Sequence, residues 1–149
     1  MNNANKVRTG KQLAAVLALI ALFALSLGSI AQEKKSTGAP TSAARPKDVD
    51  VAEFARLAGD SNNVVLDVRT PREYAGGHLA GAMNLNLRAP DFAAQAGKLD
   101  KSKTYLVYCA VGARSASACQ KLGALGFTSL VNLKTGIQGW QGAGQPVER

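Results

Sequence analysis

The residue best suited to covalent chemistry is Cys109, which begins a short loop between a predicted strand and a predicted helix. Successive backbone N–H groups of such a loop can point inward, and the helix that follows adds the positive end of its dipole. Both effects lower a thiol pKa, so the sequence predicts a nucleophilic thiolate in an anion-binding loop. The alternative is a structural cysteine that ends a strand, because free cysteines are commonly buried.

The rest of the loop fits the same interpretation. Gly112 can adopt the left-handed backbone conformation that residues with a Cβ resist. Arg114 can present a planar, permanently charged donor to an oxyanion. The other side chains are short and uncharged, which favours a small anionic ligand over a bulky one. The predicted substrate-binding residues are Ala110, Val111, Gly112, Ala113, Arg114 and Ser115.

The amino-acid composition limits the other kinds of site that the chain can form. The chain has 149 residues, of which 46% are hydrophobic, 19% charged and 5% aromatic, and this suits one ordinary globular domain. Two cysteines and a single histidine cannot build a disulfide framework or a zinc centre, so no metal is expected. The formal charge of +8 is shared between an N-terminal segment, a linker and the domain. It therefore indicates no nucleic-acid-binding patch, and no nucleic acid is expected as a partner.

Residues 1–31 have the layout of a secretory signal. Basic residues without any acidic residue precede an apolar run, Leu13 to Leu27, and small residues at positions 29 and 31 suit cleavage before Gln32. Cleavage would place the protein outside the cytoplasm, and a bacterial periplasm is the expected location. The alternative is an uncleaved anchor in the inner membrane with the domain outside the cytoplasm, the one case in which a membrane is a partner. The basic residues are Lys6, Arg8 and Lys11.

The remaining chain divides into a linker and a domain. Residues 32–47 are rich in Pro, Ser, Thr, Gly and Ala and predict a flexible linker, and residues 48–149 form the domain. In the domain, short β-branched runs alternate with helical stretches, which favours an α/β fold with a mainly parallel sheet flanked by helices. The predicted strands are Val64–Val68, Ala82–Asn86, Thr104–Cys109 and Ser129–Leu133, with a short edge strand at Val49. The predicted helices are Val51–Ala58, Asp91–Ala96 and Ser115–Leu125, the last followed by a left-handed cap at Gly126.

The sequence also indicates the start of a further helix between the first two of these strands. Thr70 can cap the helix, Pro71 suits its first position, and Glu73 can reach back to the amide of the cap residue. Two glycines then end the turn. The helix follows the strand that carries Asp67 and Arg69, so these side chains are predicted to lie where the strand ends meet.

Three stretches, in this order, resemble the rhodanese family. The segment LDVRTPREYAGGHLAGAMNLNL, Leu66 to Leu87, is similar to the family's amino-terminal signature. The loop Cys-x-x-Gly-x-Arg-Ser follows, and GIQGWQGAGQPV, Gly136 to Val147, is similar to the carboxy-terminal signature. The resemblance spans essentially all of residues 48–149 and implies a three-layer rhodanese-like domain and a single-domain sulfurtransferase.

The resemblance also implies a reaction. Cys109 would attack the outer sulfur of a small anionic donor such as thiosulfate, sulfite would leave, and the enzyme would carry a persulfide. A thiophilic acceptor, either cyanide or a thiol that can belong to a protein, would then remove the sulfur. Arg114 would hold the sulfonate end of thiosulfate, and the loop amides would stabilise the charged outer sulfur, so no cofactor is expected.

Two alternatives remain open. Many rhodanese-like domains are binding or regulatory modules without activity, and a fold alone does not decide between the two. Such modules usually lack the cysteine, which this chain keeps together with Gly112 and Arg114. Related phosphatases and arsenate reductases have five residues between cysteine and arginine, whereas four residues, Ala110 to Ala113, separate them here. The shorter loop favours sulfur over phosphate.

Five other residues are assigned weaker roles. Cys119 is expected to be a packed core thiol, with a resolving role toward oxidised Cys109 as the alternative. His78 is expected to order a turn rather than to act as an acid or base. Asp67 and Arg69 are expected to support the fold near the loop by hydrogen bonds, with direct substrate contact as the alternative. Trp140 is expected to pack after the last helix, with a place in the wall of the site as the alternative.

Overall fold

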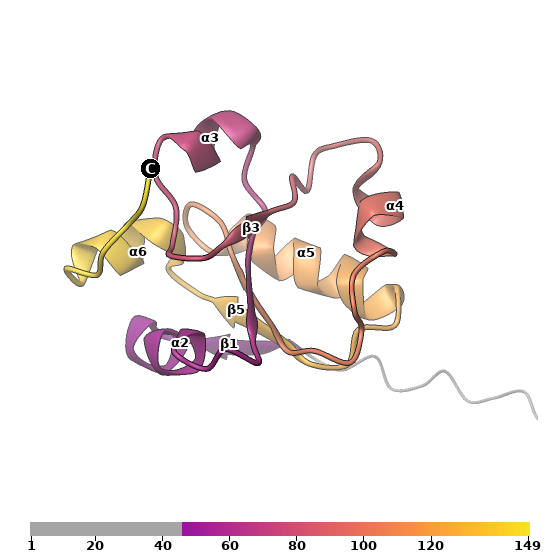
Figure 1. The fold of residues 1–149 in the computed structure, drawn as a ribbon, viewed down its shortest axis with the longest axis horizontal. Coiled ribbons are helices and arrows are strands. Elements are labelled where there is room, and N and C mark those ends of the chain that lie inside the picture. The colour runs from indigo at the N-terminus through magenta and orange to yellow at the C-terminus, as the bar shows by residue number, and fades with distance from the viewer. Residues whose placement is uncertain (1–45) are drawn as a thin grey trace, which may run out of the picture. The chain divides into compact units, whose positions relative to one another are not determined.

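The computed structural model describes residues 46–149, so the predicted signal segment and all but the last two residues of the predicted linker lie outside the described residues. In this part of the chain, five parallel strands form one sheet in the order β1-β5-β4-β2-β3 (Figure 1). The predicted α/β fold is confirmed. The strands are β1 (Lys47–Val49), β2 (Val64–Asp67), β3 (Met83–Asn84), β4 (Tyr105–Tyr108) and β5 (Leu130–Leu133).

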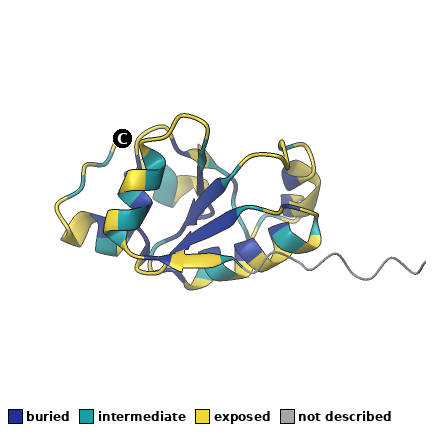
Figure 2. Ribbon diagram, turned by 90° about the horizontal axis from the view of Figure 1, so that it is seen from below, coloured by how far each residue is buried: buried dark blue, intermediate teal, exposed yellow. Residues whose placement is uncertain are grey.

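Strand β4 lies at the centre of the sheet, because it pairs with β2 on one side and with β5 on the other. All of its residues are buried, whereas β1, drawn mainly in yellow in Figure 2, is largely exposed. A continuous apolar run is what a parallel strand covered on both faces requires. Asp67 of β2 pairs with Tyr108 of β4, so these two strands end together. The residue after β4 therefore enters a shared edge of the sheet.

The edge strand β3 is shorter than the sequence suggests. The predicted strand Ala82–Asn86 is reduced to Met83–Asn84, which pairs only with Leu66 and Asp67 at the end of β2. Leu85 and Leu87 still donate their N–H groups to the carbonyls of Asp67 and Val68, so the segment follows the end of β2 a little further without forming a longer strand. The strand predicted at Val49 is present as β1, and it begins at Lys47, one residue before the predicted start of the domain.

Helices cover both faces of the sheet and make three layers. On one face α4 and α5 contribute Phe92 and Leu122 to a core that contains Cys109. On the other face α2 and α6 contribute Phe54 and Trp140 to a second core. Between residues 46 and 149, none of the helices combines the length and the hydrophobicity that spanning a membrane requires. The helices are α2 (Val51–Ala58), α3 (Pro71–Ala75), α4 (Phe92–Ala96), α5 (Ala113–Ala124) and α6 (Gly136–Gly142).

Helix α6 is a correction to the sequence analysis, which placed Trp140 after the last helix. Trp140 lies inside α6, where its indole N–H donates to the carbonyl of Pro146 at 2.8 Å. Its ring meets Phe54 edge-on, with centroids 6.1 Å apart. The segment is rich in glycine and has little intrinsic helix propensity. Burial of Ile137 and Trp140 against the sheet stabilises the helix, and that packing is not visible in the local sequence.

The predicted helix ends are confirmed at two places. Thr70 and Glu73 form the reciprocal capping box of α3. After the C-terminal end of α5, Gly126 has a φ of 94°, and Phe127 donates its N–H to the carbonyl of Leu122 at 3.1 Å. This is the 6→1 hydrogen bond of a Schellman motif. Helix α5 itself begins at Ala113, two residues before the predicted start, because Gly112 already serves as its N-cap.

Replacing Trp140 with alanine is expected to lower the free energy of unfolding by about 3–5 kcal/mol, because it empties a site packed between α2 and the sheet. Trp140→Phe keeps most of the packing and loses one hydrogen bond, so about 1–2 kcal/mol is expected. Urea unfolding followed by circular dichroism measures both values. Gln141→Ala is the control, because Gln141 is exposed on the same helix. Equal effects at Trp140 and Gln141 would contradict the packing described here.

Candidate active site

Cys109 directly follows β4 and so lies at the carboxyl edge of the sheet, where ligands bind in open α/β folds. The chain then turns through Gly112 and enters α5 at Ala113. The first turn of α5 therefore points its unpaired amides toward the cysteine, as the sequence predicts. Cys109 is fully buried, so its sulfur lies beneath the surface of the loop rather than at an open mouth.

The sulfur of Cys109 receives hydrogen bonds from the loop that follows it. The backbone N–H of Gly112 donates to Sγ at 3.1 Å. The hydroxyl of Ser115 lies 3.5 Å from Sγ and 2.9 Å from the carbonyl of Gly112. Burial disfavours the thiolate, but hydrogen bonds from Ser115 and from the amides of Val111 and Gly112 outweigh it and lower the pKa of the Cys109 thiol. The loop thus stabilises negative charge on sulfur.

Two close backbone contacts hold this loop in shape. Gly112 has a φ of 95°, and a Cβ there would overlap the carbonyl of Lys134. Gly136 has a φ of 58°, and a Cβ there would overlap the carbonyl group of Ala110. The first amides of α6 bind the loop from outside, because Ile137 donates to the carbonyl of Cys109 at 2.8 Å and Gln138 donates to that of Ala110. With these carbonyls turned toward α6, the loop amides are free to face the sulfur.

Arg114 has a partner that the sequence analysis assigned only to helix capping. Its guanidinium donates from Nη2 to Oε1 of Glu73 at 2.7 Å and from Nη1 to Oε2 at 3.0 Å. The pair holds the pKa of Glu73 far below its usual range and raises that of Arg114. The charge of Cys109 also raises the pKa of Arg114. Arg114 is therefore near the predicted site, but two of its donors are bound to a carboxylate.

Asp67 and Arg69 form a buried ion pair beside the loop. Nη2 of Arg69 lies 2.6 Å from Oδ2 of Asp67 and 2.7 Å from the carbonyl of Gly77. The guanidinium also lies over the ring of Tyr108, 5.6 Å from its centroid. Asn84 donates to the carbonyls of both Asp67 and Arg69. The pair thus joins the end of β2 to the turn after α3 and to β4.

Cys119 lies in a different environment from Cys109. It is six residues beyond the start of α5, about 9 Å along the helix axis, and it is fully buried. Burial raises the pKa of its thiol to about 12. Both cysteines are free thiols. The geometry places Cys119 in the core shared with Cys109, where its thiol stays protonated.

His78 belongs to a turn packed against α3. Its ring stacks on Tyr74 with centroids 3.8 Å apart, and its Nδ1 lies 3.1 Å from the carbonyl of Tyr74. Its backbone forms an antiparallel bridge with Glu148, which ties the end of the described chain to this turn.

Across residues 46–149, no three His, Cys, Asp or Glu side chains gather in a group that could hold a metal ion.

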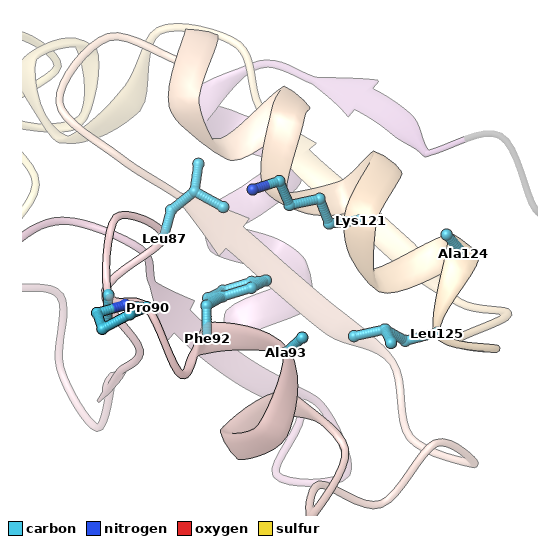
Figure 3. Close-up of a pocket in the computed structure, with 8 residues that line it drawn as sticks. Leu87, Pro90, Phe92, Ala93, Lys121, Ala124 and Leu125 are labelled. Carbon is cyan, nitrogen blue, oxygen red and sulfur yellow. The ribbon is translucent and has the colours of Figure 1, made fainter.

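A pocket of about 300 Å³ lies on the α4 and α5 side of the domain, between these helices and the segment before α4 (Figure 3). Its walls are apolar except for Lys121, whose ammonium lies 6.0 Å from the ring centroid of Phe92. The residues that line it include none of the cysteine loop. They are Leu87, Ala89, Pro90, Phe92, Ala93, Lys121, Ala124 and Leu125.

The fold and site define an α/β domain with a buried, hydrogen-bonded cysteine between a central strand and a helix N-terminus. The model of the rhodanese-like domain matches residues 50–143, and the chain belongs to this family. It is 31% identical over 101 residues to a protein named sulfurtransferase from Allochromatium vinosum, covering 67% of this chain and 92% of that one. It is 34% identical over 110 residues to thiosulfate sulfurtransferase 16, chloroplastic, of Arabidopsis thaliana, covering 67% of this chain and 89% of the relative.

Solved structures agree with the family assignment. A rhodanese-related protein from Thermoplasma volcanium superimposes with a TM-score of 0.61 at 31% sequence identity, covering 68% of this chain and 97% of that chain. The three-layer rhodanese-like fold predicted from the sequence is thus confirmed.

Substituting alanine for Gly112 or Gly136 is expected to destabilise the protein by about 3 kcal/mol or more, because each change combines a left-handed backbone with a backbone overlap. Gly142→Ala is the matched control, because a Cβ there would meet no atom within 4 Å. It is expected to be neutral or to stabilise by up to about 1 kcal/mol. Urea unfolding curves measure all three variants, and a loss at Gly142 as large as that at Gly112 would contradict the loop contacts.

Replacing Ser115 with alanine is expected to raise the pKa of Cys109, because it removes a hydrogen bond that favours the thiolate. The rate of alkylation by iodoacetamide, measured against pH in a Cys119→Ala background, should therefore rise at higher pH than in the parent. Ser117→Ala is the control, because Ser117 lies on the same helix and its hydroxyl donates to the carbonyl of Ala113 rather than to the sulfur. An unchanged profile in Ser115→Ala would show that the hydroxyl does not act on the sulfur.

Proposed function

We propose that this rhodanese-like protein is a sulfurtransferase whose Cys109 carries sulfane sulfur as a persulfide. The observation that carries the proposal is the set of donors around Sγ, with the Gly112 amide at 3.1 Å and the Ser115 hydroxyl at 3.5 Å. Donors fixed at a buried sulfur favour a thiolate before the reaction and a charged sulfur after it. Relatives named sulfurtransferase support the same reaction class.

In the first half-reaction, the Cys109 thiolate attacks the outer sulfur of a donor such as thiosulfate. A new S–S bond forms to Cys109, the S–S bond of thiosulfate breaks, and sulfite leaves with the electron pair of that bond. The outer sulfur of the resulting persulfide lies about 2 Å beyond Sγ. Because Sγ itself is buried, this extension brings the reactive atom toward an acceptor.

In the second half-reaction, a thiolate or cyanide attacks the outer sulfur of the persulfide. The S–S bond breaks, and its electron pair returns to Cys109, which becomes a thiolate again. The attacking thiolate or the cyanide carbon supplies the electron pair of each new bond, and the sulfur or sulfite that leaves keeps the pair of each broken bond, so the proposal requires no redox cofactor. A general base is not required when the loop amides and Ser115 already favour the thiolate.

An acceptor thiol on another protein fits the surface next to the cysteine. Val111, two residues after Cys109, keeps 54% of its surface exposed, which offers a small apolar contact beside the reacting sulfur.

We further propose that the transfer takes place outside the cytoplasm. The basic residues and apolar run of positions 1–31 support export.

Intact-protein mass spectrometry tests the proposed function directly. The purified wild type is expected to gain the mass of one sulfur atom after treatment with thiosulfate and to lose it after cyanide. Cys109→Ser should gain nothing, because it has no thiolate to accept the sulfur. Cys119→Ala, the matched cysteine control, should gain sulfur as the wild type does. No gain on reduced, accessible Cys109 with any sulfane donor would refute the persulfide cycle.

A further inference from the structure

The electrostatic character of the loop depends on one ion pair. Within residues 109–115, Arg114 is the only charged side chain, and the rest are small or apolar. Glu73 binds two nitrogens of its guanidinium at 2.7 Å and 3.0 Å. Bidentate pairs of this kind fix the plane of the guanidinium as well as its position. A donor approaching Cys109 therefore meets an arginine and a carboxylate together rather than a free cation.

The carboxylate is fixed in place by α3. Oε2 of Glu73 also accepts hydrogen bonds from the backbone N–H of Thr70 at 3.0 Å and from its hydroxyl at 2.8 Å. Arg114 and these contacts hold the pKa of Glu73 far below its usual range, so the carboxylate is ionised at neutral pH. Glu73 of α3 therefore neutralises the charge of Arg114 within the protein itself.

This arrangement bears on the charge of the donor, and the inference rests on the proposed function. We propose that Glu73 is a specificity-determining residue that makes the site prefer singly charged or neutral sulfane donors over the dianion thiosulfate. With thiosulfate, the donor and the Cys109 thiolate together bring three negative charges to the loop. An organic persulfide, R–S–SH, is neutral, so it adds no charge to the single negative charge of the Cys109 thiolate. Arg72, next to Glu73 in the sequence, and Lys134, whose carbonyl lies against Gly112, are both exposed, so water and salt screen their charges.

The transfer from an organic persulfide balances without any further reactant. The Cys109 thiolate attacks the outer sulfur of R–S–SH, and the S–S bond of the donor breaks with its electron pair on R–S. The proton of the outer sulfur then moves to that leaving thiolate. The products are the Cys109 persulfide anion and the thiol R–SH, so one negative charge is present before and after the step.

Two stable donors of similar shape isolate the effect of charge. Methanethiosulfonate is thiosulfate with one charged oxygen replaced by a methyl group, and it carries one negative charge instead of two. It transfers its outer sulfur to the Cys109 thiolate and leaves as methanesulfinate. We would measure kcat/KM for both donors, with cyanide as the acceptor, in the wild type, Glu73→Gln, Glu73→Asp and Glu53→Gln. Intrinsic reactivity differs between the donors, so the quantity to compare is the change in their ratio between variants.

Removing the charge of Glu73 should act on each donor in proportion to the donor's own charge. Glu73→Gln is expected to raise kcat/KM for thiosulfate about tenfold and for methanethiosulfonate only about threefold. Glu73→Asp keeps the charge and should stay near the wild-type ratio. Glu53→Gln is the matched control, because Glu53 also lies in the first turn of a capped helix and pairs with an arginine, but on α2.

The outcomes separate the inference from the proposed function. An unchanged donor ratio in Glu73→Gln, or the same change in Glu53→Gln, would overturn the role of Glu73 while leaving the persulfide cycle intact. Failure of both donors to place sulfur on wild-type Cys109 would instead refute the proposed function. The double variant Glu73→Gln/Arg114→Gln removes both charges and should restore the wild-type ratio. If Glu73→Gln alone unfolds, the double variant is compared with Arg114→Gln, from which it differs only in the charge of residue 73. The double variant should favour thiosulfate more strongly than Arg114→Gln does, and equal ratios in the two would contradict the proposal.

Discussion

The site depends on the contact between two loop backbones, the one that follows β4 and the one that follows β5. Gly112 lies against the carbonyl of Lys134, and Gly136 lies against the carbonyl of Ala110. The parallel register of β4 and β5 brings these loops together. The amides that begin α6 then bind the carbonyls of Cys109 and Ala110. With those carbonyls turned toward α6, the backbone amides of the loop can face the sulfur.

The two cysteines show what these donors achieve. Both side chains are fully buried in one hydrophobic core, and burial alone raises a thiol pKa. At Cys119 burial dominates, and the thiol stays protonated. At Cys109 burial also disfavours the thiolate, but the hydroxyl of Ser115 and the loop amides outweigh this penalty and lower the pKa. The pKa values of the two thiols therefore differ because of a few fixed hydrogen bonds and not because of exposure to water.

The local sequence was sufficient for the features that depend on neighbouring residues. Alternating apolar and helical runs predicted the parallel sheet, and Thr70 with Glu73 predicted a capping box that the structure contains. Features that depend on distant residues could not be predicted. Helix α6 is formed from a glycine-rich segment because Trp140 packs against Phe54. The ion pair between Glu73 and Arg114 joins residues that are 41 positions apart in the sequence. The capping box already accounted for Glu73, so the sequence pointed to no second partner for its carboxylate.

The position of β1 affects how the domain folds. It pairs only with β5, and the side chains of Asp48 and Asn132 meet across 84 residues of chain. The entropy of closing so long a loop must be overcome before this pairing contributes any stability. During synthesis, Val49 and Phe54 leave the ribosome long before their partners Val131 and Leu133 exist. The nascent chain therefore keeps an apolar segment without its partners until β5 emerges, which is the state that chaperones recognise and that translocation of an unfolded chain would exploit.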